Sequence, residues 1–415
     1  MNPLYNFGIR AYKAAVRLAS CKNNKARLML KGQAQTLSYL KENLDPAGGY
    51  IWIHSSSLGE FEQARPLIEM LKKRNPQSRI LLSFFSPSGY EVRKNYNLAD
   101  AVCYLPFDLI RNVKKFLDVV KPSVAIFVKY EFWGNYLMEL HRRSVPTYII
   151  SAIFRPGQIF FRPWGGMFRK MLQCFDTLFV QNEQSRQLLE QIGITRVEVT
   201  GDTRFDRVAA VCRAARQFPL IDEFVAGARF TMVMGSSWQP DEDIVIPYFN
   251  EHPEMKLIIA PHEFDRQRLL DIMGRIGRKT MLYSHAHAGQ VADCDCLIID
   301  CFGLLSSLYR YGQLAYVGGG FGTGIHNINE AAVYGIPVIF GPNYHKFREA
   351  HDLIACEGGF SISQPEQFTT LMDRFISLPE ELHRCGNIAA TYIQSHLGAT
   401  ERIFSAIFGN TQHAQ

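Results

Sequence analysis

Short apolar runs alternate with amphipathic stretches along most of the chain, which is the pattern of strands separated by helices. In the first half, the apolar runs predict strands at Tyr50–His54, Arg79–Phe85, Val124–Val128, Thr147–Ser151, Thr177–Gln181 and Val197–Thr200. The second half repeats the pattern at Thr231–Met234, Lys256–Ala260, Cys296–Ile299, Leu314–Val317 and Pro337–Phe340. Strands that alternate with helical segments predict parallel sheets built from β–α–β units.

Two such series in a chain of 415 residues predict two doubly wound α/β domains. The boundary is expected within Gly201–Arg216, where a strand is followed by a charged stretch. We therefore predict a basic N-terminal segment at 1–31, a Rossmann-like domain at 32–205 and a second one at 206–415, and leave open whether the last helix returns to the first domain. Doubly wound sheets bind ligands at the carboxyl ends of their strands, so two facing domains predict a central cleft.

The composition excludes several classes of protein. Hydrophobic residues make up 47% and charged residues 20%, as in ordinary packed domains. No apolar run approaches the roughly 18 residues of a membrane-spanning helix, and no signal peptide is evident, so we expect a cytoplasmic protein. The 9 cysteines are an odd number and fit a reducing compartment. Cys294, Cys296 and Cys301 lie near two histidines, but no standard zinc spacing is present, which favours a structural role.

The modest net charge of +6 is unevenly distributed. The first 31 residues contain no acid and carry Arg10, Lys13, Arg17, Lys22, Lys25, Arg27 and Lys31. This excess suits an anionic surface, either lipid or nucleic acid. A series of apolar residues recurs at helical spacing, which favours a helix that lies in a membrane interface: Leu4, Phe7, Ala11, Ala14 and Leu18. Ile9 and Val16 fall elsewhere on the helical wheel, so a basic helix packed on its own domain fits equally well.

The first predicted strand ends in His54-Ser55-Ser56-Ser57-Leu58-Gly59-Glu60. Small residues such as Ser57 and Gly59 at a strand-to-helix turn let a substrate approach the backbone, which makes them candidate acceptor contacts. Glu60 lies at the start of the next helix, where a carboxylate can act as a general base or simply favour the helix start. The helix N-terminus lowers the pKa of such a group and desolvation raises it, and the sequence leaves the balance open.

A second acid, Glu131, follows the strand predicted at Val124–Val128. Parallel strands end at one edge of a sheet, so we expect Glu131 on the same side as Glu60. Two carboxylates at one site can divide the work, with one deprotonating an acceptor hydroxyl and the other orienting it.

Aromatic and basic residues are mixed in the segment from Phe154 to Trp164, which we expect to form a loop. Arg155 and Arg162 in this segment suit a phosphate or a lipid headgroup and are candidate acceptor contacts. The alternative is a buried loop whose arginines reach the surface with their charged ends.

A glycine-rich segment, Gly318-Gly319-Gly320-Phe321-Gly322-Thr323-Gly324, follows a predicted strand and resembles an anion-binding loop with free backbone amides. It does not match GxGxxG and lacks a GK[ST] ending, so the usual signatures of hydride transfer and ATP hydrolysis are absent. Glu330 is expected in the first turn of the helix at Ile328–Tyr334, where it can accept hydrogen bonds from ribose hydroxyls. Together these features predict a nucleotide-sugar site.

These segments, taken in order, resemble the Kdo transferases, glycosyltransferases of the GT-B fold that move 3-deoxy-D-manno-octulosonic acid (Kdo) from CMP-Kdo to a lipid A precursor. The resemblance covers nearly the whole chain and is carried by Ser57-Leu58-Gly59-Glu60, Tyr104-Leu105-Pro106-Phe107-Asp108, Glu131-Phe132-Trp133, Val199-Thr200-Gly201-Asp202 with Phe205-Asp206, Gly235-Ser236-Ser237-Trp238, Ala260-Pro261-His262, His326-Asn327 with Glu330, Gly335-Ile336-Pro337-Val338 and Gly341-Pro342. Many matches in sequence order are far more specific than any one of them.

The resemblance implies roles for individual residues. Glu60 corresponds to the proposed general base and Glu131 to a supporting glutamate. The residues implied to bind CMP-Kdo lie in the second domain, and the matching positions are Ser236, Pro261, His262, Gly320, Gly322, Asn327 and Glu330. The family reaction is inverting, and its leaving group is a monophosphate, so neither a metal nor a cofactor is implied.

The resemblance also implies partners and a location. The acceptor is a lipid A precursor, the surface is the anionic cytoplasmic face of the inner membrane, bound peripherally or monotopically, and no nucleic acid is involved. The chain departs from the family at Lys129, where an acid is usual, at Gly134, where a proline is usual, and at His262, where an arginine is usual, whereas Arg266 matches. Two rivals remain: a GT-B transferase or epimerase that uses a UDP-sugar, and a non-catalytic lipid- or nucleic-acid-binding protein of this fold.

Overall fold

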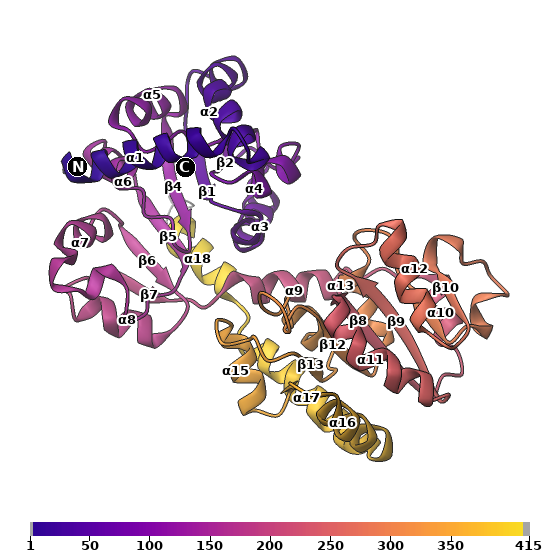
Figure 1. Ribbon diagram of the computed structural model, residues 1–415. Coiled ribbons are helices and arrows are strands. Elements are labelled where there is room, and N and C mark those ends of the chain that lie inside the picture. Colours follow the sequence, from indigo (N-terminus) through magenta and orange to yellow (C-terminus); the bar gives the residue numbers. More distant parts are fainter. Residues whose placement is uncertain (1–2, 410–415) are drawn as a thin grey trace. The chain divides into compact units, whose positions relative to one another are not determined.

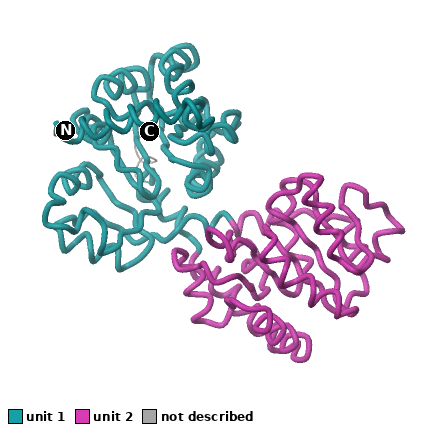
Figure 2. Tube along the Cα trace, in the orientation of Figure 1, with its two compact units in different colours: residues 1–207, 397–415 teal, residues 208–396 magenta. Residues whose placement is uncertain are grey.

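The computed structural model describes residues 3–409, which form two compact units (Figures 1 and 2). Unit 1 contains the chain up to Arg207 and again from Leu397 onward, and unit 2 contains Val208–His396. Each unit is built on one sheet of seven strands, and every strand pair in both sheets is parallel. The predicted α/β class with two doubly wound sheets is confirmed.

The sheet of unit 1 has the strand order β3-β2-β1-β4-β5-β6-β7. Its strands are β1 (Tyr50–Ser55), β2 (Ile80–Phe84), β3 (Ala101–Tyr104), β4 (Pro122–Val128), β5 (Thr147–Ala152), β6 (Thr177–Val180) and β7 (Val197–Val199). The helices of this half are α1 (Pro3–Ala19), α2 (Asn24–Asn43), α3 (Leu58–Arg74), α4 (Pro87–Arg93), α5 (Ile110–Val120), α6 (Gly134–Arg142), α7 (Gly166–Leu172), α8 (Glu183–Glu190) and α9 (Thr203–Arg213), with short 3-10 turns η1 (Ile159–Phe161) and η2 (Pro163–Gly165).

The sheet of unit 2 has the order β10-β11-β9-β8-β12-β13-β14. Its strands are β8 (Phe230–Ser237), β9 (Met255–Pro261), β10 (Thr280–Leu282), β11 (Cys296–Ile298), β12 (Leu314–Val317), β13 (Val338–Phe340) and β14 (Gly359–Ser361). Helices α10 (Pro219–Val225), α11 (Gln239–Glu251), α12 (Arg266–Arg275), α13 (Leu305–Leu308), α14 (Asn329–Ala332), α15 (Arg348–Ala355), α16 (Pro365–Ser377) and α17 (Pro379–Ser395) belong to this unit, and α18 (Ala399–Phe408) belongs to unit 1. The turns η3 (Tyr283–His285), η4 (Val291–Asp293) and η5 (Tyr309–Tyr311) complete unit 2.

Both faces of the unit 1 sheet are buried, which explains its continuous apolar strands. Trp52 and Phe127 point into one core, and their chain neighbours Ile53 and Ile126 point into the core on the opposite face. This alternation is the period-two side-chain pattern of a strand, and burial on both sides is typical of parallel sheets covered by helices.

The strand order reverses at the centre of each sheet, between β1 and β4 in unit 1 and between β8 and β12 in unit 2, and in unit 2 β11 is also inserted between β9 and β10. The two strands at each reversal pair directly with each other. The loops that follow them therefore diverge to opposite faces and leave a crevice, which is where open α/β sheets bind ligands.

The predicted strands are all present, but the sequence prediction missed β3, β10 and β14. Each has three or four residues, and all three lie at sheet edges. Length alone does not explain these misses, because β7, β11 and β13 also have three residues each and were predicted.

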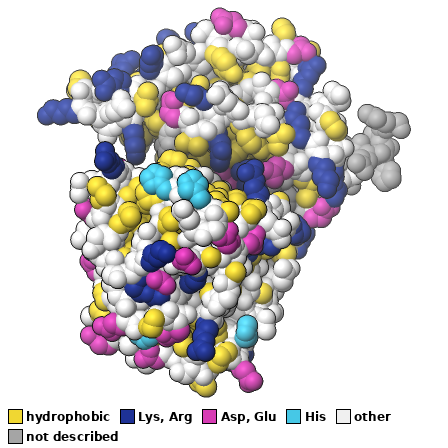
Figure 3. All heavy atoms as spheres, turned by 90° about the vertical axis from the view of Figure 1, so that its right-hand side faces the viewer, with side chains coloured by type: hydrophobic (Ala, Val, Ile, Leu, Met, Phe, Trp, Pro, Cys, Tyr) yellow, Lys and Arg dark blue, Asp and Glu magenta, His cyan; other side chains and the backbone are white. Residues whose placement is uncertain are grey.

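Helix α1 packs on its own unit, which is one of the two arrangements that the sequence left open, and it also exposes an apolar side. Its inner side carries Tyr5 and Val16, which pack against the cores of unit 1. Its outer side exposes Leu4 by 74%, Phe7 by 71% and Leu18 by 78%. In the space-filling view, Lys and Arg side chains gather at the upper left of the face (Figure 3). Within residues 3–409, no helix is both long and apolar enough to cross a bilayer.

Helix α18 returns to unit 1 and lies beside its strands, in yellow in Figure 1. Ile403 and Phe404 enter the same core as Ile53. Asp206 fixes the start of the helix: its carboxylate accepts hydrogen bonds from the backbone N–H of Gly398 (2.7 Å) and from the N–H (2.7 Å) and hydroxyl (2.6 Å) of Thr400.

Replacing Asp206 by alanine is expected to lower the free energy of unfolding of unit 1 by about 1–3 kcal/mol, because buried donors lose their acceptor. Urea denaturation followed by circular dichroism measures this change. Asp206→Asn keeps one carbonyl acceptor, so its free energy of unfolding is expected to lie between those of the wild type and Asp206→Ala. Equal stability of all three proteins would show that the α18 junction does not depend on this carboxylate.

Candidate functional site

The reversal in unit 1 brings two glutamate-bearing segments to the same edge of the sheet. β1 and β4 run side by side with His54 opposite Phe127. β1 continues through Ser56 and Ser57 into α3, and β4 continues through residues 129–133 into α6. Glu60 and Glu131 therefore lie at neighbouring carboxyl ends, as the strand pattern predicted.

Glu60 occupies the first turn of α3 and folds back onto the preceding loop. Its Oε2 accepts hydrogen bonds from the backbone N–H groups of Ser56 (2.6 Å) and Ser57 (3.2 Å). This is one half of a capping box, so Glu60 does favour the start of the helix. The same contacts hold its carboxylate in a defined orientation beside the loop.

The structure shows which of the opposing influences on the pKa of Glu60 is larger. Burial is the largest influence and the charge of Glu131 is the next, and together they raise the pKa of Glu60 to about 7. The hydrogen bonds from Ser56 and Ser57 and the charge of Lys129 oppose this rise. A carboxylate with this pKa is a proton acceptor matched to neutral pH. Lys129, the departure from the family pattern, therefore acts on Glu60 directly.

Glu131 is held between the ring nitrogens of His54 and Trp133. It is 8% exposed, and its Oε2 lies 3.0 Å from Nε2 of His54 and 2.6 Å from Nε1 of Trp133. His54 is fully buried at the end of β1. The pair thus ties the segment after β4 to the strand that leads to Glu60.

A chain of hydrogen bonds continues behind His54. Its Nδ1 lies 2.9 Å from the hydroxyl of Ser83 on β2, and that hydroxyl accepts a hydrogen bond from Nε1 of Trp52 (2.8 Å). Nδ1 also lies 3.1 Å from the backbone carbonyl oxygen of Ser83, and Nε1 of Trp133 lies 3.1 Å from Nε2. The ring of His54 is therefore held at both nitrogens, by Ser83 on one side and by Glu131 and Trp133 on the other. His54 belongs to the motif at the end of the first predicted strand, but no role was predicted for it.

Ser57 and Gly59, predicted near an acceptor, border this site. Ser57 immediately precedes α3, and its N–H is used by Glu60. A Cβ added at Gly59 would meet no atom within 4 Å, so the space beside this backbone is open. The glycine is therefore not required by packing inside the protein, and its position allows a close approach from outside.

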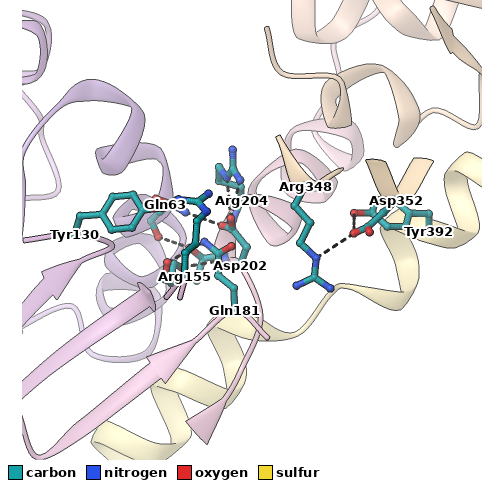
Figure 4. A network of polar contacts seen from close by, with 11 residues as sticks. Gln63, Tyr130, Arg155, Gln181, Asp202, Arg204, Arg348, Asp352 and Tyr392 are labelled. Atoms are coloured by element: carbon teal, nitrogen blue, oxygen red, sulfur yellow. Dashed lines mark hydrogen bonds and ion pairs between the residues drawn. The ribbon is translucent and has the colours of Figure 1, made fainter. Parts of the chain in front are cut away.

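The two candidate arginines are placed differently. Arg155 donates from Nη1 to the hydroxyl of Tyr130 (3.0 Å), next to Glu131, and Figure 4 shows the pair near Gln181 and Asp202. Arg162 lies exposed between η1 and η2. It sits beside Trp164, which is 71% exposed. Arg155 therefore joins the glutamate site, whereas Arg162 belongs to an exposed aromatic and basic loop.

The reversal in unit 2 places a second set of candidate residues at one sheet edge. β8 ends in a bulge, where Ser236 adopts a φ of 52° and the pairing with β9 shifts register. The backbone N–H of His262 donates to Ser237 (3.0 Å), so the segment after Pro261 continues along β8. Ser236, Pro261 and His262 are brought together as predicted.

Three rings stack at this edge. His262 lies between Trp238 and His326, with ring centroids 4.6 Å apart in both pairs and interplanar angles of 28° and 30°. Burial, assisted by the neighbouring His262, lowers the pKa of His326, which favours the neutral form of its ring. The stack was not predicted, because its three members come from loops after β8, β9 and β12.

The glycine-rich loop differs from the prediction of free backbone amides. The N–H of Gly318 donates to Gly235, that of Gly319 to the Asp241 carboxylate (3.0 Å), and those of Gly322 and Gly324 donate to Gly319. These four groups are satisfied within the protein, so the loop folds on itself instead of presenting a continuous row of donors.

Positions 320 and 322 hold glycine for different reasons. A Cβ at Gly320 would lie 2.6 Å from the backbone of Gly341, so two loops touch there and glycine is required on packing grounds. A Cβ at Gly322 would meet only the carbonyl oxygen of Gly319, at 3.6 Å. Gly322 therefore has room for a ligand, whereas Gly320 is explained by the fold.

Asn327 and Glu330 form the polar end of this edge. Nδ2 of Asn327 donates to Oε1 of Glu330 (3.0 Å), and Glu330 lies in the first turn of α14 as predicted. In the described part of the chain, Oδ1 of Asn327 and both amide atoms of Asn329 are buried without a hydrogen-bond partner. Unpaired buried polar atoms are costly, which fits a site completed by a ligand or by water.

All nine cysteines are free thiols. Among residues 3–409, no three side chains of histidine, cysteine, aspartate or glutamate are grouped as metal ligands. This includes the segment from His285 to Cys301, where the close spacing in sequence does not produce such a group.

Comparison with known proteins identifies relatives that cover most of the chain. Residues 22–207 match the family model described as 3-deoxy-D-manno-octulosonic-acid transferase. An Aquifex aeolicus 3-deoxy-D-manno-octulosonic acid transferase is 28% identical over 351 residues, covering 82% of this chain and 90% of the relative. The corresponding protein of Bordetella pertussis is 25% identical over 384 residues, covering 87% of each chain.

Solved structures share the fold at low sequence identity. A UDP-GlcNAc 2-epimerase from Neisseria meningitidis superposes with a TM-score of 0.61 at 15% identity, covering 87% of this chain and all of that one. A putative UDP-N-acetylglucosamine 2-epimerase from Listeria monocytogenes gives a TM-score of 0.60 at 13% identity, covering 89% of this chain and 98% of the other. At this identity the likeness concerns the fold.

Proposed function

Because this chain belongs to the 3-deoxy-D-manno-octulosonic acid transferase family, we propose that it moves Kdo from CMP-Kdo to a hydroxyl of a lipid A precursor, with Glu60 as general base. Kdo transfer is the activity of the family, and the acceptor, the stereochemistry and the base are our proposal. The observation that carries it is the placement of Glu60 and Glu131 at neighbouring strand ends, where burial and, second, the charge of Glu131 raise the pKa of Glu60 to about 7.

The proposed reaction is a single displacement. Glu60 takes the proton from the acceptor hydroxyl while the acceptor oxygen forms a bond to the anomeric carbon of Kdo. The bond between that carbon and the phosphate oxygen of CMP breaks, and CMP leaves with the electron pair. Attack from the side opposite the leaving group inverts the configuration. Glu131, fixed by His54 and Trp133, orients the acceptor.

Unit 2 is proposed to bind the donor. Glu330 would accept hydrogen bonds from the ribose hydroxyls, and Asn327 lies beside it. The buried side-chain amide atoms that have no protein partner, in Asn327 and Asn329, lie at the same place. The stacked rings of His262 and His326 lie at the same edge. Since four amides of the glycine-rich loop are already used, His326 is the better candidate to donate a hydrogen bond to the phosphate as CMP departs.

Unit 1 is proposed to bind the acceptor at the membrane. The acceptor carries phosphates and acyl chains, and it lies in the cytoplasmic leaflet of the inner membrane. The exposed apolar side of α1, with its basic residues, suits an anionic bilayer surface. Trp164 and Arg162 form a second exposed aromatic and basic segment that suits the same bilayer surface.

Incubation with CMP-Kdo, generated in situ, and tetraacylated lipid A precursor in the presence of EDTA tests this function. We expect a product heavier by one or more Kdo residues, read by mass spectrometry. A folded protein that yields no such product, while donor synthesis proceeds, would contradict the proposal and favour a UDP-sugar enzyme or a non-catalytic binding protein. Transfer that EDTA abolishes would contradict the absence of a metal requirement.

Replacing Glu330 by glutamine is expected to raise the dissociation constant of CMP by about 10- to 150-fold, the effect of losing a charge-assisted hydrogen bond worth about 1.5–3 kcal/mol. Isothermal titration calorimetry of the whole chain measures this. Glu366→Gln, on the exposed start of α16, is the matched control and is expected to bind CMP like the wild type. Stronger binding of UDP than of CMP would overturn the donor assignment.

A further inference from the structure

Helix α1 is connected to the segment that carries Glu131 by a hydrogen-bonding tyrosine. The hydroxyl of Tyr5 donates to Oδ2 of Asp108 (2.6 Å) and accepts from the backbone N–H of Gly134 (3.0 Å). Gly134 is the first residue of α6 and lies three positions after Glu131. A residue near the start of the chain thus bonds directly to the backbone that follows the proposed catalytic segment.

Asp108 completes the cap of α6. The carboxylate of this buried residue also accepts from the backbone N–H groups of Asn135 (2.9 Å) and Tyr136 (3.0 Å). Trp133, the residue before the helix, makes no capping hydrogen bond with its side chain. The first three N–H groups of α6 are therefore satisfied by Tyr5 and Asp108, which are remote in sequence, instead of by a local capping residue.

A neighbouring side chain strengthens the same connection. Nδ2 of Asn135 donates to the side chain of Asn6 on α1 (2.9 Å) and to the backbone carbonyl of Asp108 (2.6 Å). Two consecutive residues of α1, Tyr5 and Asn6, are therefore bonded to the first turn of α6. A helix lying loosely on the surface would not show contacts of this kind.

A second route runs through aromatic rings. Tyr12, two turns after Tyr5 on the same side of α1, stacks with Phe85 at 6.2 Å between centroids. Phe85 packs on Trp133 at 4.6 Å, and Trp133 donates its ring N–H to Glu131. Both routes begin on the inner side of α1 and end within residues 131–134.

We propose that Tyr5 is a positioning residue for Kdo transfer: by capping α6 together with Asp108, it holds the segment from Glu131 to Trp133 in its working place. The inference rests on the proposed function of Glu131. It gives the inner side of α1 a role separate from that of its exposed apolar side, because the hydrogen bonds act whether or not a bilayer is present. Docked α1 is thus part of the acceptor site.

The test uses the full chain, CMP-Kdo and tetraacylated precursor dispersed in detergent, so that no bilayer is needed. Tyr5→Phe keeps the ring and removes both hydrogen bonds of the hydroxyl. We expect kcat to fall by about tenfold with the KM for CMP-Kdo unchanged, because small displacements at a reacting centre lower the rate by such factors. Tyr39→Phe on α2 makes the same chemical change on a neighbouring helix and is expected to keep the wild-type kcat.

Amide hydrogen exchange supplies a readout that does not depend on turnover. The peptide containing Gly134, Asn135 and Tyr136 is expected to exchange faster in Tyr5→Phe than in the wild type, while peptides of unit 2 stay unchanged. A variant with unchanged exchange there, or with faster exchange and an unaltered kcat, would overturn the proposal. If the wild type itself transfers no Kdo, the proposed function has failed. If the wild type transfers Kdo and the Tyr5→Phe variant has the same kcat, only the role of Tyr5 has failed. Tyr12→Leu, which leaves the hydroxyl of Tyr5 in place, is expected to lower kcat through the ring contacts alone.

Discussion

Replacing Glu60 by glutamine is expected to lower kcat by about 10²–10⁴, the usual effect of losing a general base. Glutamine has the size of glutamate but cannot take up the proton of the sugar hydroxyl at neutral pH. The effect belongs to the chemical step, so we expect the binding of CMP to be unchanged.

The fold is expected to survive this replacement, although Glu60 also caps α3. The amide oxygen of glutamine can still accept from the N–H of Ser56, which in the wild type lies 2.6 Å from the carboxylate. The cost in stability should therefore be at most about 1 kcal/mol, within the range for a modified helix cap. Removal of a buried charge with a raised pKa offsets part of that cost, because burial already disfavours the ionised form.

Initial rates of Kdo transfer, compared with the thermal unfolding of the same preparations, measure both effects. Glu69→Gln is the matched control, since Glu69 lies on the same helix and pairs with Arg65 at the surface. We expect its rate to stay within a factor of about two of the wild type, as surface ion pairs contribute little. A Glu60→Gln protein that transfers Kdo at near the wild-type rate would remove Glu60 from the mechanism.

Replacing Glu131 by glutamine is expected to lower kcat by about 10²-fold and to shift the pH dependence of what remains. The loss in rate follows from removing a charge that is fixed in a site shielded from water. The shift in pH follows from repulsion, because the charge of Glu131 raises the pKa of Glu60.

The direction of the shift is fixed by the role of Glu60. A general base works in its ionised form, so wild-type kcat/KM is expected to fall as the pH drops through about 7. Without the negative charge at position 131, the pKa of Glu60 is lower, and the fall moves to lower pH. Rates measured between about pH 5 and 9 show this as a displaced acidic limb. Glu183→Gln on α8 serves as control, and an acidic limb that stays in place in Glu131→Gln would show that the two carboxylates are not coupled.

Much of the fold was predictable, because its strands are long apolar runs buried on both faces. The positions of Glu60 and Glu131 followed from the same pattern, since each comes just after such a strand. The edge strands β3, β10 and β14 were missed, although β7, β11 and β13 are as short and were predicted. Helix α1 was ambiguous for a physical reason: Leu4 and Phe7 face outward while Tyr5 and Val16 pack inward. The packing on unit 1 is confirmed, and binding of the outer side to a membrane stays a prediction.

The chemistry of the site depended on contacts that no sequence spacing reveals. The pKa of Glu60 could not be assigned until its burial and its neighbour Glu131 were known. Tyr5 and Asp108 are 103 positions apart, so nothing local predicts their hydrogen bond. The glycine-rich loop was misjudged in part, because the number of glycines indicates a close approach of backbones but does not say whether the partner is a ligand or, as at Gly320, another loop of the protein.

The stereochemistry of transfer is the most direct test of the central claim, that a hydroxyl activated by Glu60 displaces CMP in one step. The anomeric configuration of Kdo in the isolated product, determined by nuclear magnetic resonance, is compared with that in CMP-Kdo. Our account predicts inversion, with the product formed by the wild type and nearly absent for Glu60→Gln. Retention of configuration would require two displacements and an intermediate on the enzyme, and it would contradict a mechanism in which Glu60 acts only as a base.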